Sequence, residues 1–194
     1  MPNLSLWIWV VPALLFFWAI GAYNRLVRLR AGARRAFAVL DEQLVRQIVW
    51  VQGCLPESMR GGAQTGPAEL QDEVTAAWAL LHAASDQFAA ALAHARADLA
   101  DVPTMAGLVL AHEAMRTAWA GALAGAVAPD AVPSADRLQA RWLRLLHQSL
   151  PLRAAFNEAA QAYNQAIAQF PASFIARLAG FKPAGTVTRL AEPR

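Results

Sequence analysis

The sequence predicts an all-α fold in which an N-terminal transmembrane helix continues into an antiparallel up-down four-helix bundle. The 194-residue chain is 57% hydrophobic and only 16% charged, whereas soluble domains are about 25% charged. Its basic residues are arginines except for Lys182, and alanine, the strongest helix former, is abundant. Apolar residues recur in alternating steps of four and three, which is the pattern of helices packed along their length.

An uncharged N-terminal segment predicts the membrane span. No charged side chain occurs before Arg25, and residues 4–22 read LSLWIWVVPALLFFWAIGA. A helix of about 20 such residues crosses a hydrocarbon core of about 30 Å. A cleaved signal peptide is the alternative, but no basic residue precedes the apolar run as a signal peptide requires. We therefore assign residues 1–22 to a transmembrane anchor.

The charges around this segment predict its orientation. No basic side chain precedes it, and five arginines follow it between residues 25 and 35. Under the positive-inside rule the N-terminus lies outside and the rest of the chain lies in the cytoplasm. A second span over residues 106–128 is disfavoured because Glu113 and Arg116 sit near its middle, where each charge costs about 2.5–3.5 kcal/mol.

The pattern after the anchor predicts four long helices. The first continues to about residue 52, and the Gly and Pro residues of GCLPESMRGGAQTG form a loop after it. The second spans about residues 67–100. The third lies between breaks at residues 101–103 and 128–133.

We expect the fourth helix to begin at an N-cap on Ser134, to continue through Pro151 with a kink, and to carry its apolar seam as far as Phe170. Short connections make successive helices antiparallel. The bundle is predicted over residues 23–181, with residues 182–194 as a C-terminal tail.

Two segments carry more specific motifs. Residues 23–44 read YNRLVRLRAGARRAFAVLDEQL, and residues 156–184 read FNEAAQAYNQAIAQFPASFIARLAGFKPA. Together they resemble the LemA family of bacterial membrane proteins, which repeats aromatic-Asn pairs and continues with Phe-Pro and Gly-Phe. The residues that carry the resemblance are Tyr23, Asn24, Leu26, Val27, Asn157, Tyr163, Asn164, Phe170, Pro171, Gly180 and Phe181.

The resemblance implies a single-pass protein of the bacterial inner membrane whose helical bundle has no established enzymatic activity. It covers about 50 of the 194 residues, and the stretch from residue 47 to residue 67 departs from the family's pattern. The motif residues are then expected to be structural. Asn157 and Asn164 share one face of the fourth helix, where they either fix the register between helices or form a solvated polar stripe beside Tyr163.

We expect no enzymatic activity, no catalytic residue, no metal and no cofactor. The sequence lacks the Glu-x-x-His pair of di-iron bundles, and His112-Glu113 lacks the second His of a metalloprotease helix. His112 lies on an apolar stripe and is expected to be a packed core residue. Cys54 is the only cysteine, which excludes an internal disulfide and a multi-cysteine metal site.

Basic residues predict a lipid-binding surface. Residues 23–35 and 171–194 carry nine basic side chains and one acidic side chain. The two segments should meet at the membrane, where each Arg near an anionic leaflet contributes about 1 kcal/mol. We expect a basic collar that lies around the base of two helices, without a pocket of carboxylates or aromatic rings. The residues of the basic collar are Arg25, Arg28, Arg34, Arg35, Arg177 and Lys182.

The predicted function is a non-enzymatic, membrane-anchored scaffold or interaction module in a bacterial envelope process. The alternative is a bundle-type signalling or phosphorelay module, which would need one exposed reactive histidine. The expected partners are membrane lipid and unidentified membrane or envelope proteins. We expect no nucleic acid partner because the sequence shows no aromatic residues interleaved with the basic ones. The oligomeric state, a homo-oligomer included, stays open.

Overall fold

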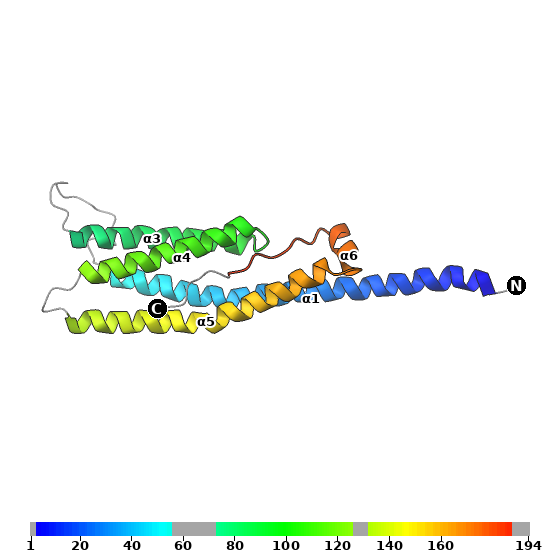
Figure 1. Cartoon of the computed structure of the whole chain (residues 1–194), viewed down its shortest axis with the longest axis horizontal. Helices are drawn as coiled ribbons and strands as arrows, with labels where there is room; N and C mark the ends of the chain where they lie inside the picture. The colour runs from blue at the N-terminus through cyan, green and yellow to red at the C-terminus, as the bar shows by residue number, and fades with distance from the viewer. Residues whose placement is uncertain (1–2, 56–72, 126–131, 188–194) are drawn as a thin grey trace.

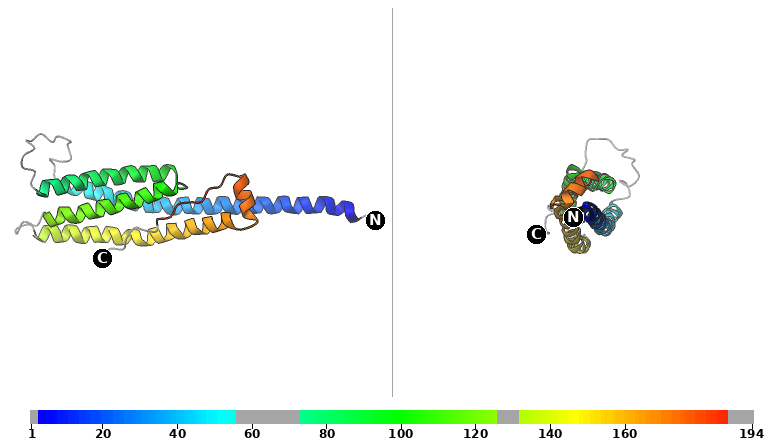
Figure 2. Two further views of the ribbon diagram at one scale, coloured as in Figure 1. Left: turned by 45° about the horizontal axis from the view of Figure 1, so that its top comes forward. Right: turned by 90° about the vertical axis from the view of Figure 1, so that its right-hand side faces the viewer.

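The computed structural model describes residues 3–55, 73–125 and 132–187. Within these ranges all the regular secondary structure is helical, which confirms the all-α prediction. Four long helices lie side by side along one axis, and the first extends well beyond the others toward the N-terminus (Figures 1 and 2). The elements are α1 (Asn3–Cys54), α3 (Glu73–Ala97), α4 (Val102–Gly125), α5 (Val132–Ala168) and α6 (Ala172–Leu178).

The ends of the helices refine the predicted boundaries. α4 begins at Val102, because Asp101 caps it by accepting a hydrogen bond from the backbone N–H of Thr104 at 3.2 Å. α5 begins at Val132, so Ser134 lies inside its first turn and not at the N-cap. Pro133 is tolerated there because the first N–H groups of a helix have no partner within it. α5 continues through Pro151 as expected.

Residues 56–66 of the predicted loop and the chain beyond residue 187 lie outside the described residues, whereas Gly53 and Cys54 continue α1. So does the start predicted for the second helix, whose described part begins at Glu73.

The core follows the predicted seams. Trp119, Phe88 and Phe156 are the largest fully buried side chains. Toward the end of the bundle farthest from the N-terminus, the indole of Trp50 stacks on that of Trp142, with ring centroids 6.0 Å apart. The core that joins the four helices includes Phe37, Leu40, Leu44, Val51, Leu81, Leu92, Ala95, Leu108, Met115 and Leu146.

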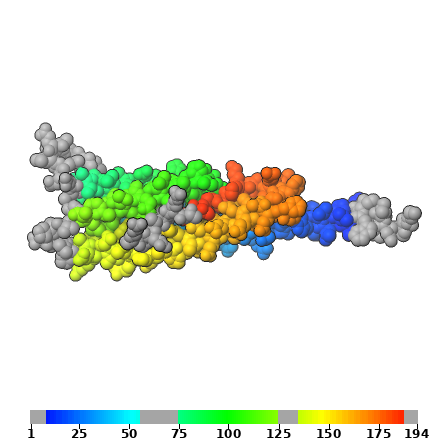
Figure 3. Space-filling view, in the orientation of Figure 1, coloured from blue at the N-terminus to red at the C-terminus, as the bar shows by residue number. Residues whose placement is uncertain are grey.

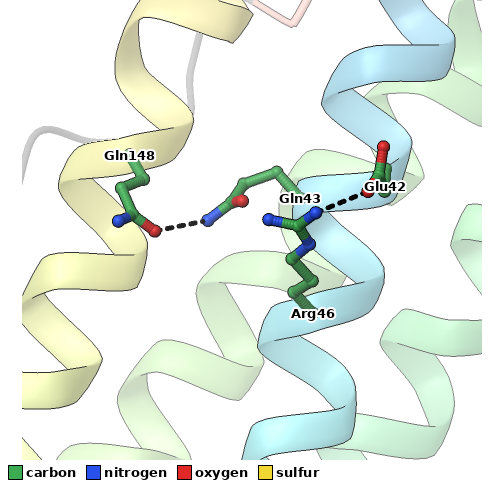
Figure 4. A network of polar contacts seen from close by, with 4 residues as sticks. All are labelled: Glu42, Gln43, Arg46 and Gln148. Atoms are coloured by element: carbon green, nitrogen blue, oxygen red, sulfur yellow. Dashed lines mark hydrogen bonds and ion pairs between the residues drawn. The ribbon is translucent and has the colours of Figure 1, made fainter.

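Polar side chains also cross the buried interface between α1 and α5. Gln43 and Gln47 both donate to the backbone carbonyl of Leu145, at 3.3 and 3.2 Å. Gln43 also reaches Gln148 on α5, while Glu42 and Arg46 pair on the outer face of α1 (Figure 4). A buried amide that lacks a partner costs about 1–3 kcal/mol, so these bonds favour one alignment of α1 on α5. The apolar periodicity did not indicate them.

The hairpin of α3 and α4 is shorter than the pair formed by α1 and α5. The Nε of Arg96, near the end of α3, lies 2.8 Å from Oδ1 of Asp41 on α1. Asp41 follows Leu26 by 15 residues, or about 22 Å of helix. The turn between α3 and α4 therefore lies level with Asp41, about 22 Å along α1 from Leu26.

We call residues 23–37 and 157–187 the neck. It contains the middle of α1, the end of α5, α6, and residues 181–187, which we call the strap. The strap fills the space between the α3–α4 hairpin and the end of α5 (Figure 3). The sequence assigned its residues from 182 onward to a tail, yet Val187 is fully buried in the main core.

The fourth helix ends earlier than predicted. α5 stops at Ala168, and after the turn at Phe170 and Pro171 a separate short helix, α6, begins. Phe170 was predicted to lie in the apolar seam, but its side chain is 89% exposed. Proline at position 171 lacks the N–H that a continuing helix would need, so the direction of the chain changes here.

Candidate functional site

The neck brings together the motif residues from the two ends of the chain. Tyr23, Asn24, Leu26 and Val27 lie on α1. The other seven lie on the end of α5, in the turns before and after α6, or at the start of the strap. The antiparallel arrangement predicts that Tyr23 and Asn24 pack against the end of the fourth helix, between Tyr163 and Phe170. In the structure Leu26 is fully buried and packs with Ala166 of α5 and Ala176 of α6.

Aromatic contacts continue this small core toward the anchor. The ring centroids of Tyr23 and Phe181 lie 5.8 Å apart, and those of Tyr163 and Phe181 lie 6.5 Å apart. The guanidinium of Arg30 lies 5.8 Å from the centroid of the Phe181 ring, within the range of a cation–π contact. Phe181 thus joins α1, α5 and the strap.

Gly180 ends α6 and directs the chain into the strap. Its φ of +69° lies in the left-handed region that favours glycine. The N–H of Phe181 donates to the carbonyl of Ala176 at 2.9 Å, and the N–H of Gly180 donates to that of Arg177 at 3.3 Å. These two bonds form a Schellman motif, and Phe181 makes the apolar contact that accompanies it. The Gly-Phe pair in the motif therefore has a structural role.

The two asparagines of α5 bind the backbone of the strap. Oδ1 of Asn164 accepts from the N–H of Ala184 and its Nδ2 donates to the Ala184 carbonyl, both at 2.8 Å. Asn157 makes the same pair of bonds with Val187, at 2.8 and 3.2 Å. Neither interpretation drawn from the sequence is right, because the asparagines pair with an extended segment and not with another helix or with solvent.

The spacing of these pairs follows from the geometry of the two segments. Seven residues of α-helix rise about 10.5 Å, and three residues of extended chain span about 10 Å. Asn157 and Asn164 therefore match Val187 and Ala184 when the strap runs antiparallel to α5. A side-chain amide presents a donor and an acceptor, as a backbone amide does, so each asparagine substitutes for one residue of a neighbouring strand.

Other groups hold the strap from both sides. The N–H of Gly185 donates to the carbonyl of Leu99 in the α3–α4 turn at 2.9 Å. A Cβ at this position would lie 2.6 Å from Cγ of Met105, so only glycine fits without a shift. The hydroxyl of Tyr163 donates to the carbonyl of Lys182 at 2.9 Å. Burial raises the pKa of Tyr163, although Arg30 and Arg34 oppose the rise, so this donor keeps its proton at neutral pH.

The basic collar surrounds the neck. All six residues are exposed, and with Arg30 they make seven basic side chains and no acidic one in residues 23–35 and 171–187. One part of the prediction is wrong, because Arg34 and Lys182 line a cavity of about 320 Å³ together with the carboxylates of Asp41 and Asp98 and the rings of Tyr163 and Phe156. The other four residues of the basic collar do not line it.

The histidines are the other side chains that could carry out chemistry. His112 is 2% exposed, and its Nε2 lies 3.0 Å from Oε1 of Gln47. Gln47 uses its Nε2 to donate to the carbonyl of Leu145, so its Oε1 is the acceptor that faces His112. The neutral imidazole of His112 therefore carries its proton on Nε2. Burial, with Arg116 and Arg153 nearby, lowers the pKa of His112 to about 3. The geometry matches the packed core residue that the sequence suggested.

No three His, Cys, Asp or Glu side chains within the described ranges lie close enough together to hold a metal ion. In the same part of the chain α1 is the one helix long and apolar enough to cross a membrane. Only 6% of its most apolar segment is buried against the rest of the protein. Comparison of the chain with protein-family models, with curated proteins and with solved structures finds no match.

Proposed function

We propose that this protein is a single-pass inner-membrane protein whose cytoplasmic helical bundle serves as a non-enzymatic scaffold or interaction module. One observation carries the proposal. The exposed apolar part of α1 runs without a break into the neck, whose residues 23–35 and 171–187 carry seven basic side chains and no acidic one. A membrane span followed directly by cations matches the positive-inside rule, with the N-terminus outside.

In this proposal the long helices form an antiparallel up-down four-helix bundle of LemA type. The directions of α1, α3, α4 and α5 in Figure 1 support that arrangement. The meeting of all eleven motif residues in the neck supports the family likeness, because two segments far apart in sequence then specify one place in the fold. Attraction between the basic collar and anionic headgroups would hold the bundle close to the leaflet from which it emerges.

Vesicle binding tests the role of the basic collar. Residues 24–194 without the anchor should bind vesicles that contain phosphatidylglycerol at low ionic strength, and should dissociate at high salt because the attraction is screened. Changing Arg25, Arg28, Arg177 and Lys182 to Gln should abolish this binding while the helical circular dichroism stays the same. The matched control changes Arg137, Arg141 and Arg144, at the far end of α5, and should bind as before. If the parent chain does not bind anionic vesicles at low salt, the arginines serve only to orient the anchor while it inserts into the membrane.

A crosslinking experiment tests the scaffold role. Crosslinked purification of the full chain from native membranes should recover stable membrane or envelope proteins, and phosphohistidine should be absent. A chain phosphorylated by a sensor kinase at His82, His94 or His147 would overturn the scaffold proposal in favour of a relay.

A further inference from the structure

Three large apolar side chains close to the predicted span are exposed on the surface. Phe170, Phe174 and Leu178 are 89%, 69% and 81% exposed. Phe174 and Leu178 are four residues apart, so they share one face of α6. Phe170 lies in the turn that precedes α6, four residues before Phe174. The opposite face carries Ala176, which is buried against Leu26 and Ala166. α6 therefore packs a small apolar residue inward and exposes its larger apolar residues.

The position of α6 along α1 coincides with the end of the apolar segment. Ala176 packs on Leu26, which follows Ala22, the last residue of the predicted span, by four residues, or about 6 Å of helix. Interfacial helices lie about 5–10 Å deep in the boundary between headgroups and acyl chains. If α1 crosses the bilayer with its apolar segment, α6 lies in that boundary.

The direction of α6 suits the same place. In Figure 1 and in both views of Figure 2, α6 lies across the long axis of α1 and α5. A helix that crosses the direction of a membrane span lies roughly in the plane of the membrane. The long helices α3, α4 and α5 all run along that axis and do not share this orientation.

The charges and aromatic rings around α6 point to lipid and not to protein. Arg25 and Arg28 of α1 are exposed at the level of α6, and Arg177 lies on α6 itself. Cations beside exposed Phe and Leu are typical of elements that lie in an anionic membrane surface. Away from the anchor, Leu80 on α3 is also exposed (63%), but no exposed aromatic ring lies within one helical turn of it.

We propose that α6, together with Phe170, inserts into the headgroup region of the leaflet from which α1 emerges, so that the protein contacts the bilayer at a second point beside its span. The inference rests on the proposed membrane anchoring. It adds an apolar contact that persists in salt, whereas the contact through the basic collar is electrostatic and screened.

Depth-dependent fluorescence quenching tests this insertion in the full chain. In a Cys54→Ala background, an environment-sensitive fluorophore is attached at Leu14→Cys in the span, at Phe174→Cys or Leu178→Cys in α6, and at Leu80→Cys in α3. Each protein is reconstituted into vesicles of phosphatidylcholine and phosphatidylglycerol at high salt. Some vesicles carry lipids whose acyl chains bear a quencher, near the headgroup end in one set, to detect a label in the headgroup region, and near the methyl end in another, to detect a label at the centre of the span. Circular dichroism checks that each variant keeps its helical content.

The expected result is a blue-shifted, quenched emission at positions 14, 174 and 178, and an unquenched emission, as in water, at position 80. Quenching at position 14 without quenching at 174 and 178 would overturn the insertion of α6 and leave the anchor in place. That pattern would also arise if a second copy or another protein covered α6. An unquenched label at position 14 would overturn the proposed anchoring, and the insertion of α6 with it.

Discussion

Asn157 and Val187 exchange two hydrogen bonds, in which the side-chain amide of the first pairs with the backbone N–H and carbonyl of the second. Asn164 repeats the arrangement at Ala184. Through these four bonds α5 binds a segment that would otherwise leave the backbone groups of buried residues without partners. The neck therefore depends on side chains that an apolar pattern does not detect.

Replacing Asn164 by Ala should release the strap. The change removes two hydrogen bonds, each of which contributes about 0.5–1.5 kcal/mol, so amide exchange at Ala184 should accelerate about 5- to 150-fold. Hydrogen exchange of the full chain in nanodiscs measures the effect. Gln161→Ala, at an exposed position on the same helix, should leave the exchange unchanged. Equal exchange in both variants would show that Asn164 does not hold the strap.

Gly185→Ala should destabilise the fold. The new methyl group would lie 2.6 Å from Cγ and 2.9 Å from Cβ of Met105, and overpacking of this kind costs about 1–3 kcal/mol. The control is Gly107→Ala in α4, where a Cβ meets nothing within 4 Å and where alanine should stabilise the helix by about 0.5–1 kcal/mol. Thermal unfolding in detergent should therefore move the two melting temperatures in opposite directions. A Gly185→Ala protein as stable as the parent would contradict the close packing of the strap.

Stability should fall as the pH drops through the range in which free histidine titrates. His112 has a pKa of about 3 in the folded state and about 6.5 when unfolded, so only the unfolded chain takes up this proton between those values. The stabilisation is complete above pH 6.5 and declines below it, by about 1.4 kcal/mol between pH 7.5 and pH 5.5.

Chemical unfolding at the two pH values checks this expectation. The loss should be smaller by about that amount in His112→Gln than in the parent, whereas His94→Gln, at an exposed position, should behave like the parent. If all three proteins lose the same stability, His112 does not control the acid response.

The orientation of the chain can be tested by fusion. A reporter that is active only in the periplasm, joined after Arg194, should give no signal, since the proposed topology places the bundle in the cytoplasm on the side of the basic residues that follow the span. The same reporter joined before Met1 should be active. A strong signal from the C-terminal fusion would invert the proposed topology.

The sequence predicted the parts of the fold that rest on periodicity. Leu40, Leu81, Leu108 and Phe156 all lie in the core at seam positions. Periodicity wrongly placed Phe170 in the core. The apolar pattern continues to Phe170, whereas α5 stops at Ala168, shortly before Pro171. Periodicity also missed the strap, since an extended segment of seven residues has no helical period and its hydrogen-bond partners lie between 19 and 86 residues away.

The sequence predicted which residues belong to the candidate site but not how they lie relative to one another. The sequence identified the asparagines, the Gly-Phe pair and the arginines of the neck. It did not place Arg34 and Lys182 on one cavity with Asp41 and Tyr163, because these residues come from distant parts of the chain. Only the crossing of α1, α5 and the strap brings them together.

The small core around Leu26 has a consequence for the order in which the protein is made. Its partners Ala166 and Ala176 follow it by 140 and 150 residues, so at about 5–20 residues per second the ribosome supplies them roughly 7 to 30 seconds later. During that interval the start of α1 has left the ribosome without its protein contacts. In the proposed topology its arginines can meet lipid headgroups first, and the neck assembles on a helix that the membrane already holds.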